Sequence, residues 1–357
     1  MGNIRPLRLL FCGNLGSEFN ACWQHSEVMR NFNFDLSVFD FTHYMQFGLI
    51  TRLQKFANGT AWEFPRSAII GFNTEFIHRI KAICPDIVWV EKALLLLPET
   101  LSEARSILPN AIFVCCQEDN PFGQRRTEVP DWKHFIDAMP LYDLHFTKRK
   151  SDFAPYKLHG AKRIAIISHG YFAPFQHPYA LSEIPNHLKH DTVFVGYPYD
   201  HRVASISHLL DRYRLVIDVY GSKWNRHWVY WRHRQRFHGS VIGHIYAQAI
   251  SGTKICLGYV SSSNLDEYTV RSVEIPACGS FFLAERTPTH QEMYEEGKEA
   301  EFFDSDAECA NKIRFYLHHD EQRQKIARAG YERCIRSDYS LERYTREAVQ
   351  KILQLRG

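Results

Sequence analysis

Between residues 266 and 284 lies a stretch whose residue types could bind an anion. Asp266 or Thr269 is suited to cap a helix that starts there, which leaves N–H groups of its first turn free for an anion. Arg271 can add a forked cationic contact to phosphate oxygens, and Glu274 follows three residues later on the same face. The stretch therefore predicts one wall of a phosphate-binding site. The alternative is an ordinary βαβ unit whose charged side chains are solvated.

Two apolar runs enclose this helix and predict the strands that position it. Residues 254–260 have the length of a buried strand and run into a polar loop, and residues 281–284 form the next apolar run. Pro276 and Gly279 are expected to end the helix, because Gly279 can adopt the left-handed conformation at low cost. The stretch thus reads as a helix between two buried strands.

The first half of the chain shows the same alternation of strands and helices. Strands are predicted at about 8–13, 34–39, 87–90, 111–116, 144–147 and 163–167, and helices at about 17–30, 74–83 and 98–108. The loop after the first strand holds Gly13 and Gly16 but not the GxGxxG fingerprint, which argues against a dehydrogenase. Glu118 and Asp119 follow a strand directly, where open α/β sheets bind ligands, although Asp-Asn-Pro is also ordinary turn chemistry.

The second half restarts the rhythm after a proline-rich segment, residues 169–191, which is the candidate linker. Strands at 191–196 and 215–221 end at Gly196 and Gly221, as expected where a ligand approaches the backbone in a tight turn. A helix is predicted at 202–212, and helices at 306–317, 320–336 and 340–355 close the chain. We therefore predict an α/β protein of two doubly wound domains with a cleft between them.

Composition limits the function classes. A length of 357 residues favours two domains, and a formal net charge of +3 argues against a dedicated nucleic-acid protein. The nine cysteines have no metal-ligand spacing and fit a reducing cytoplasm, so no metal site is predicted and none of them is assigned to catalysis. No run approaches the ~18 apolar residues of a membrane span, so any membrane contact is expected to be peripheral.

Residues 223–244 form a basic and aromatic cluster without an acidic residue. Interleaved arginine and tryptophan can stack on bases and hold phosphates, or lie at a lipid surface. The alternative is a loop whose cations serve a bound diphosphate and whose aromatic rings pack on the domain. The histidines of the cluster are irregularly spaced and have no acidic residue nearby in the sequence, which argues against a zinc site.

Several short motifs between Val193 and Arg343 occur in a recognisable order. They are Phe194-Val195-Gly196 with Arg202, Tyr220-Gly221-Ser222-Lys223-Trp224, Tyr246 with Lys254-Ile255-Cys256-Leu257, Asp266-x-x-Thr269-x-Arg271-x-x-Glu274-x-x-Ala277-Cys278-Gly279, Glu301-Phe302-Phe303, and Ile326-Ala327-x-Ala329-Gly330. Together they resemble glycosyltransferases of the GT-B fold, and within them the CgeB-like (spore maturation protein) group. One departure concerns the second carboxylate of retaining members, expected eight residues after Glu274, where this chain has Phe282; Glu285 lies three residues further.

The resemblance implies two Rossmann-like domains facing across a cleft: an acceptor domain at 1–180, a donor domain at 190–337, and a final helix at 338–357 that crosses back. It implies a metal-independent enzyme with a nucleotide sugar as co-substrate and no cofactor. Asp119 is the first candidate for the general base that deprotonates the acceptor, Glu118 the second and His169 the third. The donor-binding candidates are Gly13, Gly16, Gly196, Arg202, Tyr220, Gly221, Lys223, Tyr246, Thr269, Arg271, Glu274 and Gly279.

Two other functions remain open from the sequence. A GT-B relative could epimerise or hydrolyse nucleotide sugars without an acceptor, or a non-catalytic GT-B scaffold could bind nucleic acid or a membrane surface through residues 223–244. The acceptor hydroxyl could belong to a glycan, a protein, a lipid-linked intermediate or a nucleic acid. The expected location is the cytoplasm.

Overall fold

The computed structural model describes residues 5–18, 20–45, 64–92, 94–123 and 129–356. The chain divides into two compact units, which we call unit 1 (residues 1–168 and 344–357) and unit 2 (residues 169–343). The segment 169–191, predicted as a linker, therefore belongs to unit 2. One reason is visible in its hydrogen bonds: the N–H of Tyr171 donates to the carbonyl of Tyr339, and the N–H of Leu341 donates to the carbonyl of Tyr171.

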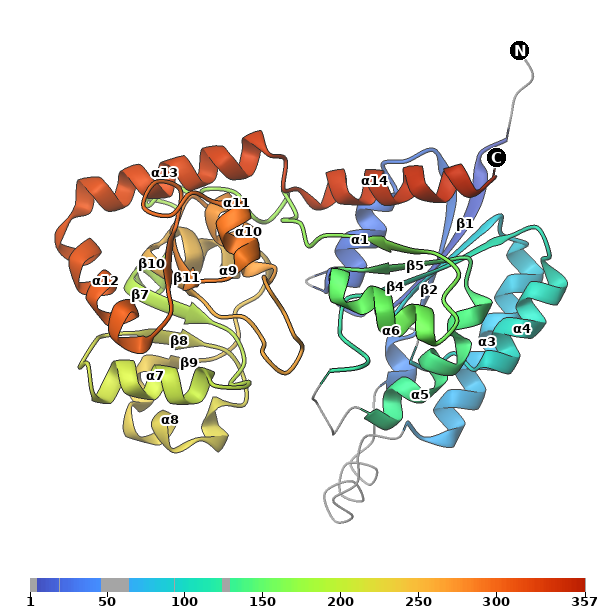
Figure 1. Ribbon diagram of the computed structural model, residues 1–357, viewed down its shortest axis with the longest axis horizontal. Helices are drawn as coiled ribbons and strands as arrows, with labels where there is room; N and C mark the ends of the chain where they lie inside the picture. The colour runs from blue at the N-terminus through green and yellow to red at the C-terminus, as the bar shows by residue number, and fades with distance from the viewer. Residues whose placement is uncertain (1–4, 19, 46–63, 93, 124–128, 357) are drawn as a thin grey trace. The chain divides into compact units, whose positions relative to one another are not determined.

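Unit 1 is built on one parallel sheet with the strand order β2-β1-β3-β4-β5-β6 (Figure 1). Its strands are β1 (Leu7–Gly13), β2 (Phe34–Asp40), β3 (Ile87–Glu91), β4 (Ile112–Gln117), β5 (Leu144–Thr147) and β6 (Ile164–Ile166). Its helices are α1 (Ala21–Met29), α3 (Arg66–Ile83), α4 (Pro98–Ile107), α5 (Val129–Ala138), α6 (Phe153–Leu158) and most of α14 (Leu341–Leu353).

Both faces of this sheet are buried, as expected for parallel strands covered by crossover helices. Alternate residues of one strand enter different cores: Val88 and Val90 join one hydrophobic cluster, and Ile87 and Trp89 join the other. The six predicted strands are confirmed. The helices agree less well, because α3 begins at Arg66, and α5 and α6 were not predicted.

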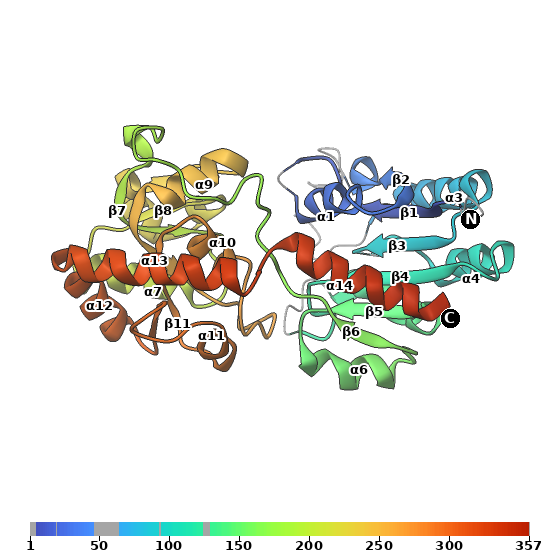
Figure 2. The same ribbon diagram turned by 90° about the horizontal axis from the view of Figure 1, so that it is seen from above.

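The C-terminal helix α14 lies along the sheet of unit 1 (Figure 2). Ala348, Val349 and Ile352 are buried in the same cluster as Trp89. The ammonium of Lys351 donates a 3.2 Å hydrogen bond to the carbonyl of Ile166, in β6. The end of the chain therefore packs on the N-terminal unit, as the fold expected from the sequence requires.

Unit 2 is also built on one parallel sheet, with the order β12-β11-β10-β7-β8-β9. Its strands are β7 (His190–Val195), β8 (Asp218–Tyr220), β9 (Phe237–His238), β10 (Thr253–Gly258), β11 (Phe281–Glu285) and β12 (Glu301–Phe303). Its helices are α7 (Arg202–Asp211), α8 (Trp228–Arg232), α9 (Gly243–Ser251), α10 (Arg271–Ala277), α11 (Pro288–Met293), α12 (Asp306–His318) and α13 (Asp320–Arg336). Two sheets of this kind confirm the predicted α/β fold of two Rossmann-like units.

The helix α10 differs from its prediction at the start. It begins at Arg271 after Val270, and neither Asp266 nor Thr269 caps it. The carboxylate of Asp266 instead accepts from the amide of Asn264 at 2.9 Å. The end is as predicted, because Gly279 has φ +75° and its N–H donates to the carbonyl of Pro276 at 2.8 Å.

Two further expectations concern the membrane and the cysteines. Within the described residues, no helix is both long enough and apolar enough to cross a membrane. All nine cysteines are free thiols, and all except Cys84 are buried.

Candidate functional site

The strand order of unit 2 reverses direction between β7 and β10, because later strands lie on both sides of this pair. Open α/β sheets bind ligands outside the carboxyl ends of the strands at such a switch point. Arg202, the first residue of α7, is buried there. Its guanidinium donates to the carbonyl of Tyr197, after β7, at 3.4 Å and to the carbonyl of Tyr259, after β10, at 3.3 Å. The switch point of unit 2 thus carries a fixed cation.

A second guanidinium, that of Arg271 at the start of α10, lies near the first. Burial lowers the pKa of Arg202, and the charge of Arg271 lowers it further. The Nε atoms of both arginines are buried, and neither has a hydrogen-bond partner within the described residues. Two repelling cations with unpaired donors are stabilised by an anion that can contact both, and a diphosphate has this charge and these acceptor oxygens.

Glu274 and Tyr246 form the polar wall beside Arg271. The hydroxyl of Tyr246 donates a 2.8 Å hydrogen bond to a carboxylate oxygen of Glu274, and both side chains are buried. The guanidinium carbon of Arg271 lies 5.6 Å from the centre of the Tyr246 ring. Burial would lower the pKa of Arg271, but Tyr246 and Glu274 outweigh it and raise that pKa. Glu274 is therefore held in place by Tyr246, within reach of the electrostatic field of Arg271.

The turns after β7 and β8 bring two backbones together. Gly221 has φ +149°, and a Cβ added to it would lie 2.2 Å from the carbonyl oxygen of Gly196. That same oxygen accepts a hydrogen bond from the indole N–H of Trp224 at 2.9 Å. Lys223, two residues after Gly221, has φ +69°, and its ammonium lies 5.5 Å from the ring centre of Tyr197. A side chain at position 221 would separate these two turns.

We predict that Gly221→Ala lowers the free energy of unfolding by at least about 2 kcal/mol, because the methyl group overlaps a backbone oxygen in a left-handed conformation. Chemical denaturation of the purified protein measures this change. The matched control is Gly239→Ala, since a Cβ at Gly239 would meet no atom within 4 Å. Equal stability of the two variants would contradict the close approach of the turns.

Tyr220 and Gly279 are donor-binding candidates whose groups lie away from Arg202 and Arg271, and Thr269 lies in the turn before α10. The hydroxyl of Tyr220 hydrogen-bonds with His190, at the amino end of β7, and burial raises its pKa to about 12. The N–H of Thr269 donates to the hydroxyl of Ser272 at 3.1 Å. Gly279 follows the C-terminal end of α10, whereas Arg271 begins that helix. The hydroxyl of Tyr220 and the backbone of Gly279 are therefore not brought to Arg202 and Arg271.

Phe282 stands where retaining GT-B enzymes are expected to have a second carboxylate, and Glu285 lies three residues further along β11. Phe282 is 1% exposed in β11, so the position expected to carry the second carboxylate is part of the core. Glu285 ends the same strand and accepts from the N–H of Val260 at 2.7 Å. Its other oxygen lies 2.5 Å from Nε2 of His201, and this hydrogen bond raises the pKa of His201. Glu285 is thus the carboxylate of β11 at the carboxyl edge, and His201 is its partner.

In unit 1, the strand order reverses between β1 and β3. A lysine–aspartate ion pair lies at the carboxyl edge of this sheet. Lys92 directly follows β3 with φ +54°, and its ammonium lies 3.5 Å from the carboxylate of Asp119, after β4. Asp119 is the main cause of the raised pKa of Lys92, and Glu118 contributes to it. Both acidic candidates therefore lie at the carboxyl edge of unit 1, together with a lysine that the sequence analysis did not select.

His25, Glu91 and Cys116 form a buried cluster behind this edge, contributed by α1, β3 and β4. Nδ1 of His25 lies 2.5 Å from Oε1 of Glu91, and the indole N–H of Trp89 donates to the same oxygen at 3.2 Å. Two ligands of a tetrahedral zinc ion would be about 3.3 Å apart. The shorter distance favours a direct His–Glu hydrogen bond over shared coordination of an ion.

This pair predicts a pH-dependent stability. Burial lowers the pKa of His25, but the charge of Glu91 and its hydrogen bond outweigh burial, so the pKa is raised above its usual value of 6.5. A raised pKa means that the pair contributes its stability below pH ~6.5 and loses it as the pH rises through the folded-state value. We expect the free energy of unfolding to fall in that interval for the wild type. His25→Gln should lose this component, and an unchanged pH slope would contradict it.

The remaining candidates are Gly13 and Gly16, predicted to bind the donor, and His169, the third candidate for the general base. Gly13 ends β1, and the N–H of Gly16 donates to the hydroxyl of Thr42 at 2.8 Å, so both belong to unit 1, whereas the other donor candidates belong to unit 2. His169 begins unit 2, and its N–H donates to the hydroxyl of Tyr268 at 2.9 Å. The structure thus assigns His169 to a different unit from Asp119 and Glu118.

The chain is similar to known proteins in part of its sequence and in its fold. The family described as glycosyl transferase-like matches residues 192–350, from β7 into α14. A search of curated proteins gave no match.

Solved structures extend the similarity in fold to nearly the whole chain. Sucrose-phosphate synthase from Thermosynechococcus elongatus has a TM-score of 0.68 at 12% identity, covering 98% of this chain and 99% of that one. HepE from Anabaena, in complex with UDP-glucose, has a TM-score of 0.67 at 12% identity, covering 98% and 100%. A glycosyltransferase from Rickettsia africae has a TM-score of 0.63 at 11% identity, covering 99% of each chain. These structures confirm the predicted GT-B fold, and the family match over residues 192–350 agrees with the predicted glycosyltransferase class.

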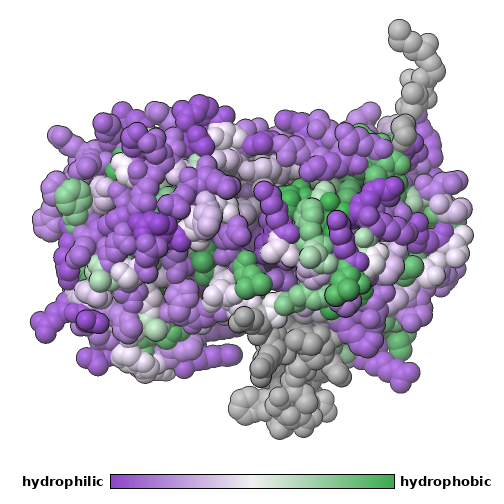
Figure 3. Space-filling view, viewed as in Figure 1, coloured by the Kyte–Doolittle hydropathy of each residue, from purple (hydrophilic) through white to green (hydrophobic). Residues whose placement is uncertain are grey.

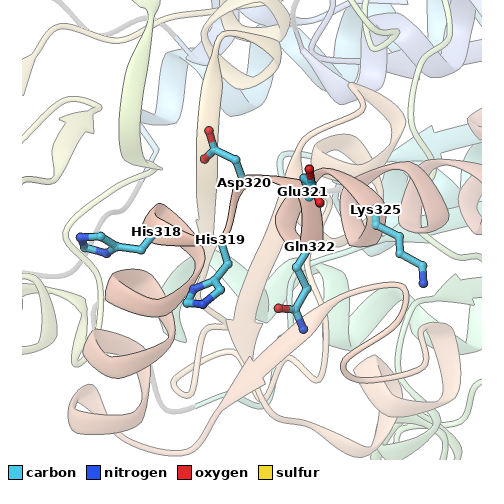
Figure 4. Close-up of a pocket in the computed structure, with 6 residues that line it drawn as sticks. All are labelled: His318, His319, Asp320, Glu321, Gln322 and Lys325. Carbon is cyan, nitrogen blue, oxygen red and sulfur yellow. The ribbon is translucent and has the colours of Figure 1, made fainter.

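A hollow in unit 2 lies away from Arg202 and Arg271. It is lined by His318, His319, Asp320, Glu321, Gln322 and Lys325, where α12 meets α13. Since α12 follows the carboxyl end of β12, its last residues lie toward the opposite edge of the sheet. Figure 4 shows that the side chains of His318 and Lys325 point away from one another. Because this hollow lies away from the switch point of the sheet, it is not the candidate site.

Proposed function

We propose that this protein transfers a sugar from a nucleoside diphosphate sugar to an acceptor hydroxyl, with unit 2 binding the donor and unit 1 supplying the base. The observation that carries the proposal is the pair Arg202 and Arg271. Their guanidiniums lie close enough to repel each other at the switch point, and each has a buried Nε without a partner within the described residues. A diphosphate satisfies both the charge and the donors.

The donor would be held by groups of unit 2. Arg202 and Arg271 would contact the diphosphate, and Lys223 would add a third cation. Glu274, oriented by Tyr246, has one carboxylate oxygen beyond that hydrogen bond with which to accept from a ribose or sugar hydroxyl. HepE, with the same fold, has been solved with UDP-glucose and with UDP and glucose, which supports a UDP-sugar as the first donor to test.

The chemistry would be displacement at the anomeric carbon. The acceptor oxygen forms a bond to that carbon, the bond to the diphosphate oxygen breaks, and the acceptor proton passes to the carboxylate of Asp119. Lys92 keeps that carboxylate fixed through its 3.5 Å ion pair. The negative charge that develops on the leaving diphosphate would be stabilised by the three cations of unit 2.

Because these cations would neutralise the diphosphate, we predict that transfer continues without a divalent metal. The full-length protein is incubated with UDP-glucose, UDP-GlcNAc or GDP-mannose and a panel of glycan, peptide and lipid-linked acceptors, with and without EDTA, and the products are identified by mass spectrometry. Equal rates with and without EDTA are expected. Loss of transfer in EDTA and its recovery with Mg²⁺ or Mn²⁺ would contradict metal independence.

A control without acceptor distinguishes the other enzymatic function. Release of free sugar or formation of an epimer from the donor alone, with no product in the presence of any acceptor, would replace transfer by hydrolysis or epimerisation. The order of motifs between Val193 and Arg343 supports membership of the CgeB-like group. The nine free thiols support a cytoplasmic location.

A further inference from the structure

One face of unit 2 combines exposed tryptophans with arginines. We call it the Trp228 face and define it by five exposed residues, Arg226, Trp228, Trp231, Arg232 and Arg234, on α8 and the short turns on either side of it. Trp228 and Trp231 are 55% and 68% exposed. Within the described part of the chain, they are the only exposed tryptophans. Two such side chains, three residues apart, share one side of α8.

The opposite side of α8 fixes the helix on unit 2. Val229 is fully buried, and the ring of Tyr230 lies 5.5 Å from that of Phe237 in the core. His233, at the end of the helix, hydrogen-bonds with Asp211 at 2.9 Å. The outward position of the tryptophans is therefore set by the packing of their neighbours.

The sequence around the Trp228 face carries positive charges and no negative ones. Between residues 219 and 265 there are six lysines and arginines and no aspartate or glutamate, whereas the whole chain has a net charge of only +3. Arg232 is paired with Asp211, but within the described residues no carboxylate pairs with Arg226 or Arg234. α8 lies at the lower edge of unit 2 in Figure 1, and Figure 3 shows mainly hydrophilic side chains along that edge. The face is thus positive where its tryptophans are exposed.

We propose that the Trp228 face binds the surface of a membrane that contains anionic phospholipids. Indole rings favour the boundary between lipid headgroups and acyl chains, and arginines beside them attract anionic headgroups. A nucleic acid fits less well, because stacking on a base needs an open ring face. The guanidinium of Arg232 lies over the ring of Trp228, 5.9 Å from its centre, and so occupies one face of that ring.

Vesicle co-sedimentation of the full-length protein tests the proposal. We expect binding to phosphatidylcholine vesicles with 30% phosphatidylglycerol, about tenfold weaker binding to phosphatidylcholine alone, and a decline with salt concentration. Trp228→Ala with Trp231→Ala, and separately Arg226→Glu with Arg234→Glu, should each lower the partition coefficient about tenfold or more. The matched control is Lys325→Glu with Arg328→Glu, which makes the same change in charge on the exposed side of α13 and should bind as the wild type does.

Two results of these binding measurements would contradict the membrane proposal. Absence of binding to anionic vesicles, or equal loss in the face variants and the α13 control, would overturn the proposal. Salt-sensitive binding of single-stranded RNA without binding of vesicles would assign the face to nucleic acid instead. Circular dichroism and thermal melting of each variant confirm its folding, so that a loss of binding is attributed to the face.

Discussion

Arg271→Ala is expected to lower kcat/KM for sugar transfer by about 100- to 1,000-fold, the size of effect seen when a group that stabilises developing negative charge is removed. The variant keeps Arg202 but loses the second cation and the donors that would contact the diphosphate. Steady-state kinetics at varied donor concentration measures the change. Because Arg271 also contacts the ring of Tyr246, thermal melting is recorded alongside.

Two companion variants separate charge from geometry. Arg271→Lys keeps the positive charge but loses the fork, so an intermediate kcat/KM is expected. Arg328→Ala removes an exposed arginine from α13 and should leave transfer unchanged. If Arg271→Ala retained wild-type kcat/KM while folding normally, the assignment of the diphosphate to this side chain would be wrong.

Asp119→Asn is expected to lower kcat by about 100- to 10,000-fold, because the amide has nearly the shape of the carboxylate but cannot act as a base toward the acceptor hydroxyl. Donor binding should change little, since Asp119 belongs to unit 1 and the arginine pair to unit 2. The split between kcat and the donor Kd is the informative readout, measured by kinetics and by calorimetry on the same sample.

Glu118→Gln is the matched variant for this prediction. It removes the neighbouring carboxylate from the same loop and should have a smaller effect, because Asp119 is the one that pairs with Lys92. A large loss of kcat in Glu118→Gln together with a near-normal Asp119→Asn would reverse the two assignments. Similar small effects in both would place the base elsewhere.

The fold could be predicted largely because buried parallel strands leave a direct signal. Apolar runs such as 87–90 and 281–284 match β3 and β11 closely, since both faces of each strand are covered. Short elements were missed where packing, and not local pattern, determines them. The helix α8 has only five residues and is fixed by Val229 and Tyr230 against the core.

The candidate site could be predicted only in part. Arg202 and Arg271 are recognisable from motifs, but their proximity follows from the order β10-β7 in the sheet, which the sequence does not state. The same holds for Lys92, which is one of many lysines in sequence and becomes distinctive only beside Asp119. Its position directly after a buried strand is the signal that could have selected it.

Isothermal titration of the full-length protein with UDP, GDP, ADP, CDP and dTDP tests whether Arg202 and Arg271 bind a nucleoside diphosphate. We predict that at least one of these diphosphates binds with a Kd in the micromolar range, and that Arg271→Ala and Arg202→Ala each weaken this binding about tenfold or more, since each lost charge-assisted contact is worth about 1.5–3 kcal/mol. Absence of binding by all five diphosphates, or wild-type affinity in both arginine variants, would contradict the account.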